Sequence, residues 1–168
     1  MIPEYIYDIW SSGLCPGLVR GGRFFDGSDM RCVYDLSDTV SFSERMEEIC
    51  TERFARDRDI GLLELLRQAV RAAAVCDDWL IPVRFLDFCP EDIRCAESGE
   101  VRFILASEGS ERCPDILSGI ESILMEASAV RPELHAGSIL KRIKAEGLSS
   151  SSSFSRIERA FSAWASGL

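Results

Sequence analysis

Two aspartates five residues apart are the side chains in this sequence whose type and spacing best suit chemistry. Asp87 and Asp92 flank a short loop that contains Pro90. Two carboxylates across a loop can hold one Mg²⁺ together with water molecules, which is how this ion is usually bound. The alternative is structural: Asp87 accepts hydrogen bonds from backbone amides of the loop, and Asp92 faces solvent beside a strand. We favour the structural role and keep Asp87 and Asp92 as candidate metal ligands.

The other reactive side chains lack the spacings that metal binding or catalysis requires. No Cys-x-x-Cys pair occurs, and His135 is the only histidine, so the closely spaced ligands of a zinc site are missing. No Gly-x-Ser-x-Gly motif supports a hydrolase nucleophile. We expect His135 on the surface and the cysteines as buried or half-buried free thiols in a reducing compartment. The seven cysteines are Cys15, Cys32, Cys50, Cys76, Cys89, Cys95 and Cys113.

Length, composition and charge restrict the class of protein. The chain has 168 residues, of which 46% are hydrophobic and 28% charged, as in an ordinary folded domain. The net charge of -9 and the pI near 4.7 disfavour nucleic acid and anionic membranes as partners. Such a charge suits a basic protein partner or merely keeps the chain in solution. The N-terminus lacks a secretory pattern and no apolar run is long enough to span a bilayer, so we expect a cytoplasmic protein without membrane insertion.

The first half of the chain predicts a hairpin and two helices. Residues 19–25 and 30–36 read as strands joined by a turn at 26–29, with Gly21-Gly22 as a bend or bulge. A capping box at Ser41 and Glu44 predicts a helix from there to about Phe54. Leucine and alanine at helical spacing predict a long central helix over 59–79.

The second half predicts a small hairpin followed by helices. Period-two patterns over 88–94 and 100–105, with Ser98-Gly99 between them, favour two short strands. Helices are expected over 115–127, over 138–146 with Gly147 as the stop signal, and from Phe154 to Trp164.

The segment Phe85–Ile93, followed by Gly99–Ile104, resembles the catalytic loop of protein kinases. That loop reads His-Arg-Asp, two residues, Pro-Glu-Asn-Ile, a turn glycine, a valine strand and Asp-Phe-Gly. By this resemblance Asp87 occupies the position of the catalytic base, and Asp92 that of the magnesium-binding asparagine. The long helix over 59–79 would precede the loop, as in the kinase C-lobe.

The departures from the kinase pattern concern its chemistry. Phe85-Leu86 replace His-Arg, and Leu105-Ala106-Ser107 stand in the place of Asp-Phe-Gly. No glycine-rich phosphate loop and no Val-Ala-Ile-Lys strand are present. Phosphoryl transfer depends on positioning and on neutralising the phosphates, so too little of that apparatus remains for catalysis.

A closer resemblance is to degenerate bacterial kinase-like domains. These include the domain of unknown function that precedes forkhead-associated domains and the EssB pseudokinase region of type VII secretion. The shared features are a Tyr-Asp-Leu-Ser strand end at Tyr34–Ser37, a Leu-x-Pro turn at Leu80–Pro82, and the two motif strands at Pro90–Ile93 and Gly99–Ile104. The order of elements agrees over 24–164, and the motifs are specific over 85–104.

Together these observations predict one α+β domain over 1–168 with a reduced kinase-like fold. A β-rich part over 1–40 would precede a helical, C-lobe-like part over 41–168 that carries a small β-hairpin. The resemblance implies a non-catalytic pseudokinase-like domain that binds a protein partner in bacterial signalling or secretion, without catalytic residues, cofactor or resident metal. Two alternatives remain open: a cryptic nucleotide- or magnesium-binding enzyme using Asp87 and Asp92, and an acidic inhibitor or immunity-type protein that binds a basic partner.

Overall fold

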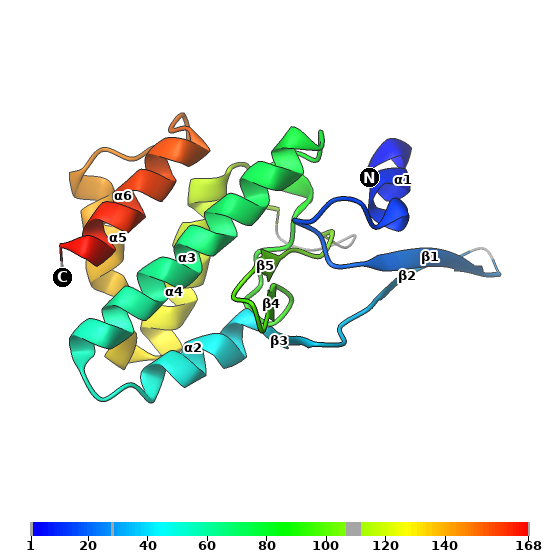
Figure 1. Cartoon of the computed structure of the whole chain (residues 1–168). Helices are drawn as coiled ribbons and strands as arrows, with labels where there is room; N and C mark the ends of the chain where they lie inside the picture. The colour runs from blue at the N-terminus through cyan, green and yellow to red at the C-terminus, as the bar shows by residue number, and fades with distance from the viewer. Residues whose placement is uncertain (1, 28, 107–111, 168) are drawn as a thin grey trace.

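The computed structural model describes residues 2–27, 29–106 and 112–167. These residues contain six α-helices and two small antiparallel sheets. The helices α2 to α6 form a body from which a hairpin and the first helix extend at one side (Figure 1). This arrangement confirms the predicted α+β class. The buried apolar residues form one continuous core that reaches from α1 to α6.

The N-terminal unit consists of helix α1 (Glu4–Ser12) and the strands β1 (Gly21–Asp26) and β2 (Asp29–Tyr34). The hairpin was predicted, with slightly longer strands, but the helix was missed. Ile6 and Trp10, four residues apart, are both fully buried and give α1 its inner face. The predicted turn at 26–29 includes Ser28, which lies outside the described residues.

Gly21-Gly22 do not form the predicted bend or bulge. The register from Gly21–Tyr34 to Asp26–Asp29 is continuous, so both glycines belong to a regular strand. Gly21 is required there for a steric reason, because a Cβ atom would lie 2.4 Å from a ring atom of Trp10. The Trp10 ring instead packs 5.0 Å from the Tyr34 ring, and its Nε1 donates to the carbonyl oxygen of Val19 at 2.9 Å.

The two predicted helices of the first half are present with shifted ends. Helix α2 spans Phe42–Cys50 and begins with the expected capping box, in which Ser41 and Glu44 bond to each other's backbone amides. It ends four residues before Phe54. Helix α3 spans Ala55–Asp78 and begins four residues before Asp59, because the charged residues that precede Asp59 form its exposed first turn.

The small sheet has three strands, in the order β3 (Thr39–Ser41), β4 (Arg94–Ala96) and β5 (Val101–Arg102). The predicted strands 88–94 and 100–105 were therefore too long, and β3 was not predicted. The chain turns at Pro90, where the amides of Asp92 and Ile93 both donate to the carbonyl oxygen of Cys89. A turn of this kind cannot continue a ladder.

The helices of the second half agree closely with prediction. Their bounds are α4 (Ile116–Val130), α5 (Ala136–Ala145) and α6 (Phe154–Ser166), and short 3₁₀ turns lie at Val83–Phe85 and Pro132–Leu134. Helix α6 packs along α3, with the buried Trp164 near its end (Figure 1). Arg67 and Arg71 of α3 both bond to Glu158 of α6, at 2.9 and 2.6 Å.

Candidate functional site

Asp87 has the structural role that the sequence favoured. The residue is 7% exposed, and one carboxylate oxygen accepts from the backbone amide of Cys89 at 2.9 Å. Its own amide donates to the carbonyl oxygen of Ile104 at 3.0 Å, which joins the loop to the segment after β5. The loop conformation thus depends on Asp87.

Asp92 lies at the other end of the same turn and is exposed, as expected. The pKa of its carboxyl is raised, first by partial burial and then by the negative charges of Asp87 and Glu91. Because Asp87 contributes to this shift, the two carboxylates interact electrostatically. The structure therefore brings the two candidate residues together.

Both aspartates line the same two hollows of the surface. The larger is a cleft of about 870 Å³ between the N-terminal unit and the loop, and we call it the hairpin cleft. The smaller, about 300 Å³, lies on the other side of the turn and also includes Cys89 and Glu126. The hairpin cleft is lined by Ile2, Tyr7, Asp29, Met30, Arg31, Cys32, Tyr34, Asp87, Asp92, Ile104, Leu105 and Ala106.

The donor set of the cleft fits a magnesium site poorly. Within 2–27, 29–106 and 112–167, no group of three or more His, Cys, Asp or Glu side chains is placed to hold a metal ion. Leu105 and Ala106, which stand where the resemblance would put a metal-binding aspartate, are buried apolar residues. Ser107 lies outside the described residues. Asp87 and Asp92 would have to share an ion whose remaining ligands came from water or a bound phosphate.

The electrostatic character of the hairpin cleft is negative. Asp29, Asp87 and Asp92 line it, and the one cationic residue among its described lining is Arg31. The Arg31 guanidinium is already paired with Asp26 at 3.3 Å. The cleft therefore favours a cationic ligand over a phosphate.

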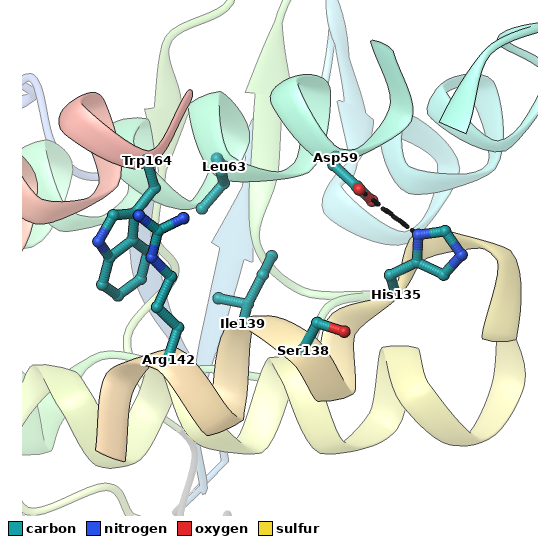
Figure 2. Close-up of a pocket in the computed structure, with 7 residues that line it drawn as sticks. All are labelled: Asp59, Leu63, His135, Ser138, Ile139, Arg142 and Trp164. Atoms are coloured by element: carbon teal, nitrogen blue, oxygen red, sulfur yellow. Dashed lines mark hydrogen bonds and ion pairs between the residues drawn. The ribbon is translucent and has the colours of Figure 1, made fainter. Parts of the chain in front are cut away.

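A second pocket lies between α3, α5 and α6 and contains the only histidine (Figure 2). The Nδ1 atom of His135 is 3.2 Å from a carboxylate oxygen of Asp59. Ser138 follows one turn later, but Figure 2 shows the second ring nitrogen of His135 pointing away from the Ser138 hydroxyl. A Ser-His-Asp relay needs that nitrogen on the serine, so the three residues do not form one.

The same pocket has little room for a ligand. Its volume is about 90 Å³, enough for roughly three water molecules. Leu63 and Ile139 form its apolar side, and the guanidinium of Arg142 lies 4.8 Å from the centre of the Trp164 ring. His135 is exposed, as predicted, and connects the start of α3 to the start of α5.

Sequence reasoning missed one thiol pair. Cys15 and Cys76 are both buried, and a hydrogen bond from the Cys76 thiol, with help from the amides of Gly17 and Leu18, lowers the pKa of Cys15 from its ordinary value. The two residues are far apart in sequence, so no spacing signal exists for the pair. None of the seven cysteines forms a disulfide, and Cys89 is exposed on its turn, whereas the sequence predicted buried or half-buried thiols.

Comparison with known proteins assigns no class to the chain. No family model matches it, and no curated protein is similar to it. A search of the described helices finds none with the length and apolar character to cross a membrane.

Proposed function

We propose that this chain is a non-catalytic protein-binding domain with a reduced kinase-like arrangement, and that it binds its partner through the hairpin and the adjoining cleft. The observation that carries the proposal is the gathering of exposed apolar side chains on β1 and β2. Phe24 is 47% exposed, Phe25 68%, Met30 39% and Val33 54%. A two-stranded hairpin is of marginal stability by itself, so exposed apolar residues on it are a cost that partner binding offsets.

The position of the loop supports the kinase-like part of the proposal. Asp87 and Asp92 face the unit that carries the hairpin, across a cleft, in the way that a kinase catalytic loop faces the N-lobe. The chemistry does not follow the likeness. A triphosphate needs cationic groups around it, whereas three aspartates line this cleft and Arg31 is held by Asp26.

The nucleotide-binding alternative has one specific observation in its favour, namely that Asp87 and Asp92 line the same hollows. A thermal-shift titration with ATP and MgCl₂ separates it from our proposal. Specific binding at a hundredfold excess over Kd stabilises the folded state by about 2.7 kcal/mol. We expect no shift. A magnesium-dependent shift that disappears in Asp92→Asn would replace our proposal with the enzyme hypothesis.

Site-specific crosslinking tests the binding surface directly. A photoreactive phenylalanine analogue at position 25 should give adducts with a discrete partner protein in the native host. The matched control is the same analogue at Met125, which is 65% exposed on α4 and lies away from the hairpin. Equal adduct patterns at positions 25 and 125, or none at 25, would contradict a binding role for the hairpin.

A further inference from the structure

The alternation of hydrogen-bonded and non-hydrogen-bonded pairs along the hairpin shows which backbone groups of β2 are directed away from β1. The amide of Asp35 donates to the carbonyl oxygen of Arg20 at 2.8 Å, which continues the register of the hairpin by one pair. In an antiparallel ladder the N–H and C=O of one residue point to the same side, and alternate residues point to opposite sides. The backbone groups of Met30, Cys32 and Tyr34 are therefore directed to the outer edge of β2.

This outer edge has no strand partner in the described part of the chain. The sheet that contains β2 consists of β1 and β2 alone, and the amides of Met30 and Cys32 make no backbone hydrogen bond to any described residue outside it. An unpaired edge of this kind is a template for another strand.

The outer edge of β2 borders the hairpin cleft. Met30, Cys32 and Tyr34 all line it. On the opposite wall, Ile104 accepts from Asp87, Ala106 donates to Phe85, and the carbonyl oxygen of Leu105 accepts from the Tyr34 hydroxyl. Among the described residues of the cleft, the regular strand with an unpaired edge is β2.

At Tyr34, the C-terminal end of β2, the outer edge is already joined to the opposite wall of the cleft. The Tyr34 hydroxyl donates to the carbonyl oxygen of Leu105 at 3.3 Å, which connects β2 to the far wall. No described residue outside the hairpin makes a backbone hydrogen bond to the stretch from Met30 to Cys32. Its two outward-directed residues offer two N–H donors and two C=O acceptors to an incoming strand.

Charge and apolar contacts indicate what kind of segment this edge would accept. Asp29 and Asp92 are exposed carboxylates of the cleft, and they favour lysine or arginine. Phe25 and Met30 are directly opposite in the register and exposed, so they give an apolar surface on one face of the hairpin. Successive residues of a strand point to opposite faces, so an occupant that alternates basic and apolar residues satisfies both features.

We propose that the outer edge of β2 accepts an extended segment of a partner protein as a third strand, with lysine or arginine alternating with apolar residues. The inference rests on the proposed protein-binding function and specifies the chemistry of the partner. Addition of such a strand accounts for three features together: the unpaired edge of β2, the negative charge of the hairpin cleft, and the exposed apolar side chains of Phe25 and Met30.

Fluorescence anisotropy with synthetic peptides tests the proposal. The probe is a labelled octapeptide of alternating lysine and valine, and the charge control alternates glutamate and valine. A third peptide has the lysine–valine sequence with an N-methyl group on every backbone nitrogen, which removes the backbone donors of both edges and leaves the charge unchanged. At low salt we expect the first peptide to bind at least tenfold more tightly than either of the others.

Variants of the protein locate the site. Asp92→Asn and Asp29→Asn should each weaken binding of the lysine–valine peptide several-fold, whereas Asp57→Asn, an equal change of charge at the exposed start of α3, should not. Amide hydrogen exchange at Met30 and Cys32 should slow when the peptide binds.

Three results would overturn the inference. Equal binding of the N-methylated peptide would show that charge alone attracts the probe. Equal loss in Asp57→Asn and Asp92→Asn would place the peptide elsewhere, and no binding of any peptide would exclude the edge as a strand acceptor. Crosslinking at position 25 is independent of these peptides, so the protein-binding function can stand if the strand-addition inference fails.

Discussion

Cys89 is exposed and shares its turn with the two aspartates of the cleft. The pKa of its thiol is raised, first by partial burial and then by the negative charges of Asp92, Asp87 and Glu126. The thiolate is the reactive form, so these carboxylates slow alkylation. Cys89 therefore reports chemically on the electrostatics of the turn and of the smaller hollow that it lines.

Asp92→Asn should accelerate alkylation of Cys89 by iodoacetamide. Removing the nearby negative charge stabilises the thiolate and lowers the thiol pKa. Because exposed charge pairs are worth about 0.2–1 kcal/mol, the rate should rise by about 1.5- to fivefold at low salt. Mass spectrometry of the Cys89 peptide measures the rate, with Asp57→Asn as the control. An unchanged rate would mean that Asp92 exerts no field at this turn.

The hydrogen bond of Asp87 was predictable, because aspartate side chains in loops commonly accept from the backbone amide two residues later. Asp87 accepts from the amide of Cys89 in this way. The thiol contact between Cys15 and Cys76 was not predictable. It depends on the docking of the segment after α1 onto the end of α3, which no local spacing encodes.

At the scale of elements, Gly119 determines how closely α4 approaches the loop of the candidate site. A Cβ atom at this position would lie 2.3 Å from a ring carbon of Phe88. Phe88 is buried and packs 5.0 Å from the Phe103 ring, so it has little freedom to move. The glycine thus permits the loop to rest on α4.

Gly119→Ala should destabilise the protein although alanine is the better helix former. Overpacking costs about 1–3 kcal/mol, against a gain of up to about 1 kcal/mol in helix propensity. Urea denaturation measures the change in the free energy of unfolding. The control is Gly137→Ala in α5, where the nearest described atom, Oγ of Ser128, would be 3.5 Å away. Equal effects of the two substitutions would contradict the close approach of α4 to Phe88.

Periodicity predicted the long elements and failed for the short ones. The stripe of α3 and the capping box of α2 are local signals, and both were read correctly apart from the helix ends. Helix α1 was missed because it has no side-chain N-cap, whereas α2, of the same length, begins with a capping box. Strand β3 spans only Thr39–Ser41 and exists because β4 pairs with it, which is a tertiary effect.

At the scale of the whole molecule, the net charge of -9 opposes compaction. Ion pairs stabilise the folded state, and salt weakens them too. Among them are the contacts of Arg67 and Arg71 with Glu158. Partly exposed pairs contribute little individually, so repulsion of the excess carboxylates should dominate.

Raising NaCl from 20 to 300 mM should therefore raise Tm, by about 1–3 °C if screening recovers about 0.5–1 kcal/mol. Differential scanning fluorimetry measures the shift, and the same series in KCl controls for a specific effect of sodium. A fall in Tm would show that the arginine–glutamate contacts between α3 and α6 outweigh the net repulsion.

The α+β class followed from the sequence, but the hairpin cleft did not. Its walls come from Asp29–Tyr34 and from Asp87–Ala106, which meet only after the chain has folded. The sequence identified Asp87 and Asp92 as neighbours of a loop. The residues of β2 carry no local signal that this strand would lie across from the two aspartates, and only the kinase resemblance implied a β-rich part near the loop.

The positions of two buried tryptophans have a consequence for observing how this chain folds. Trp10 is in α1 against the hairpin, and Trp164 is in α6 at the opposite side of the molecule (Figure 1). Replacing the more exposed Trp79 together with either Trp164 or Trp10 by phenylalanine leaves one tryptophan. The fluorescence of that tryptophan then reports on one end of the molecule. Comparing the emission of the two forms during denaturation separates local opening of the N-terminal unit from global unfolding.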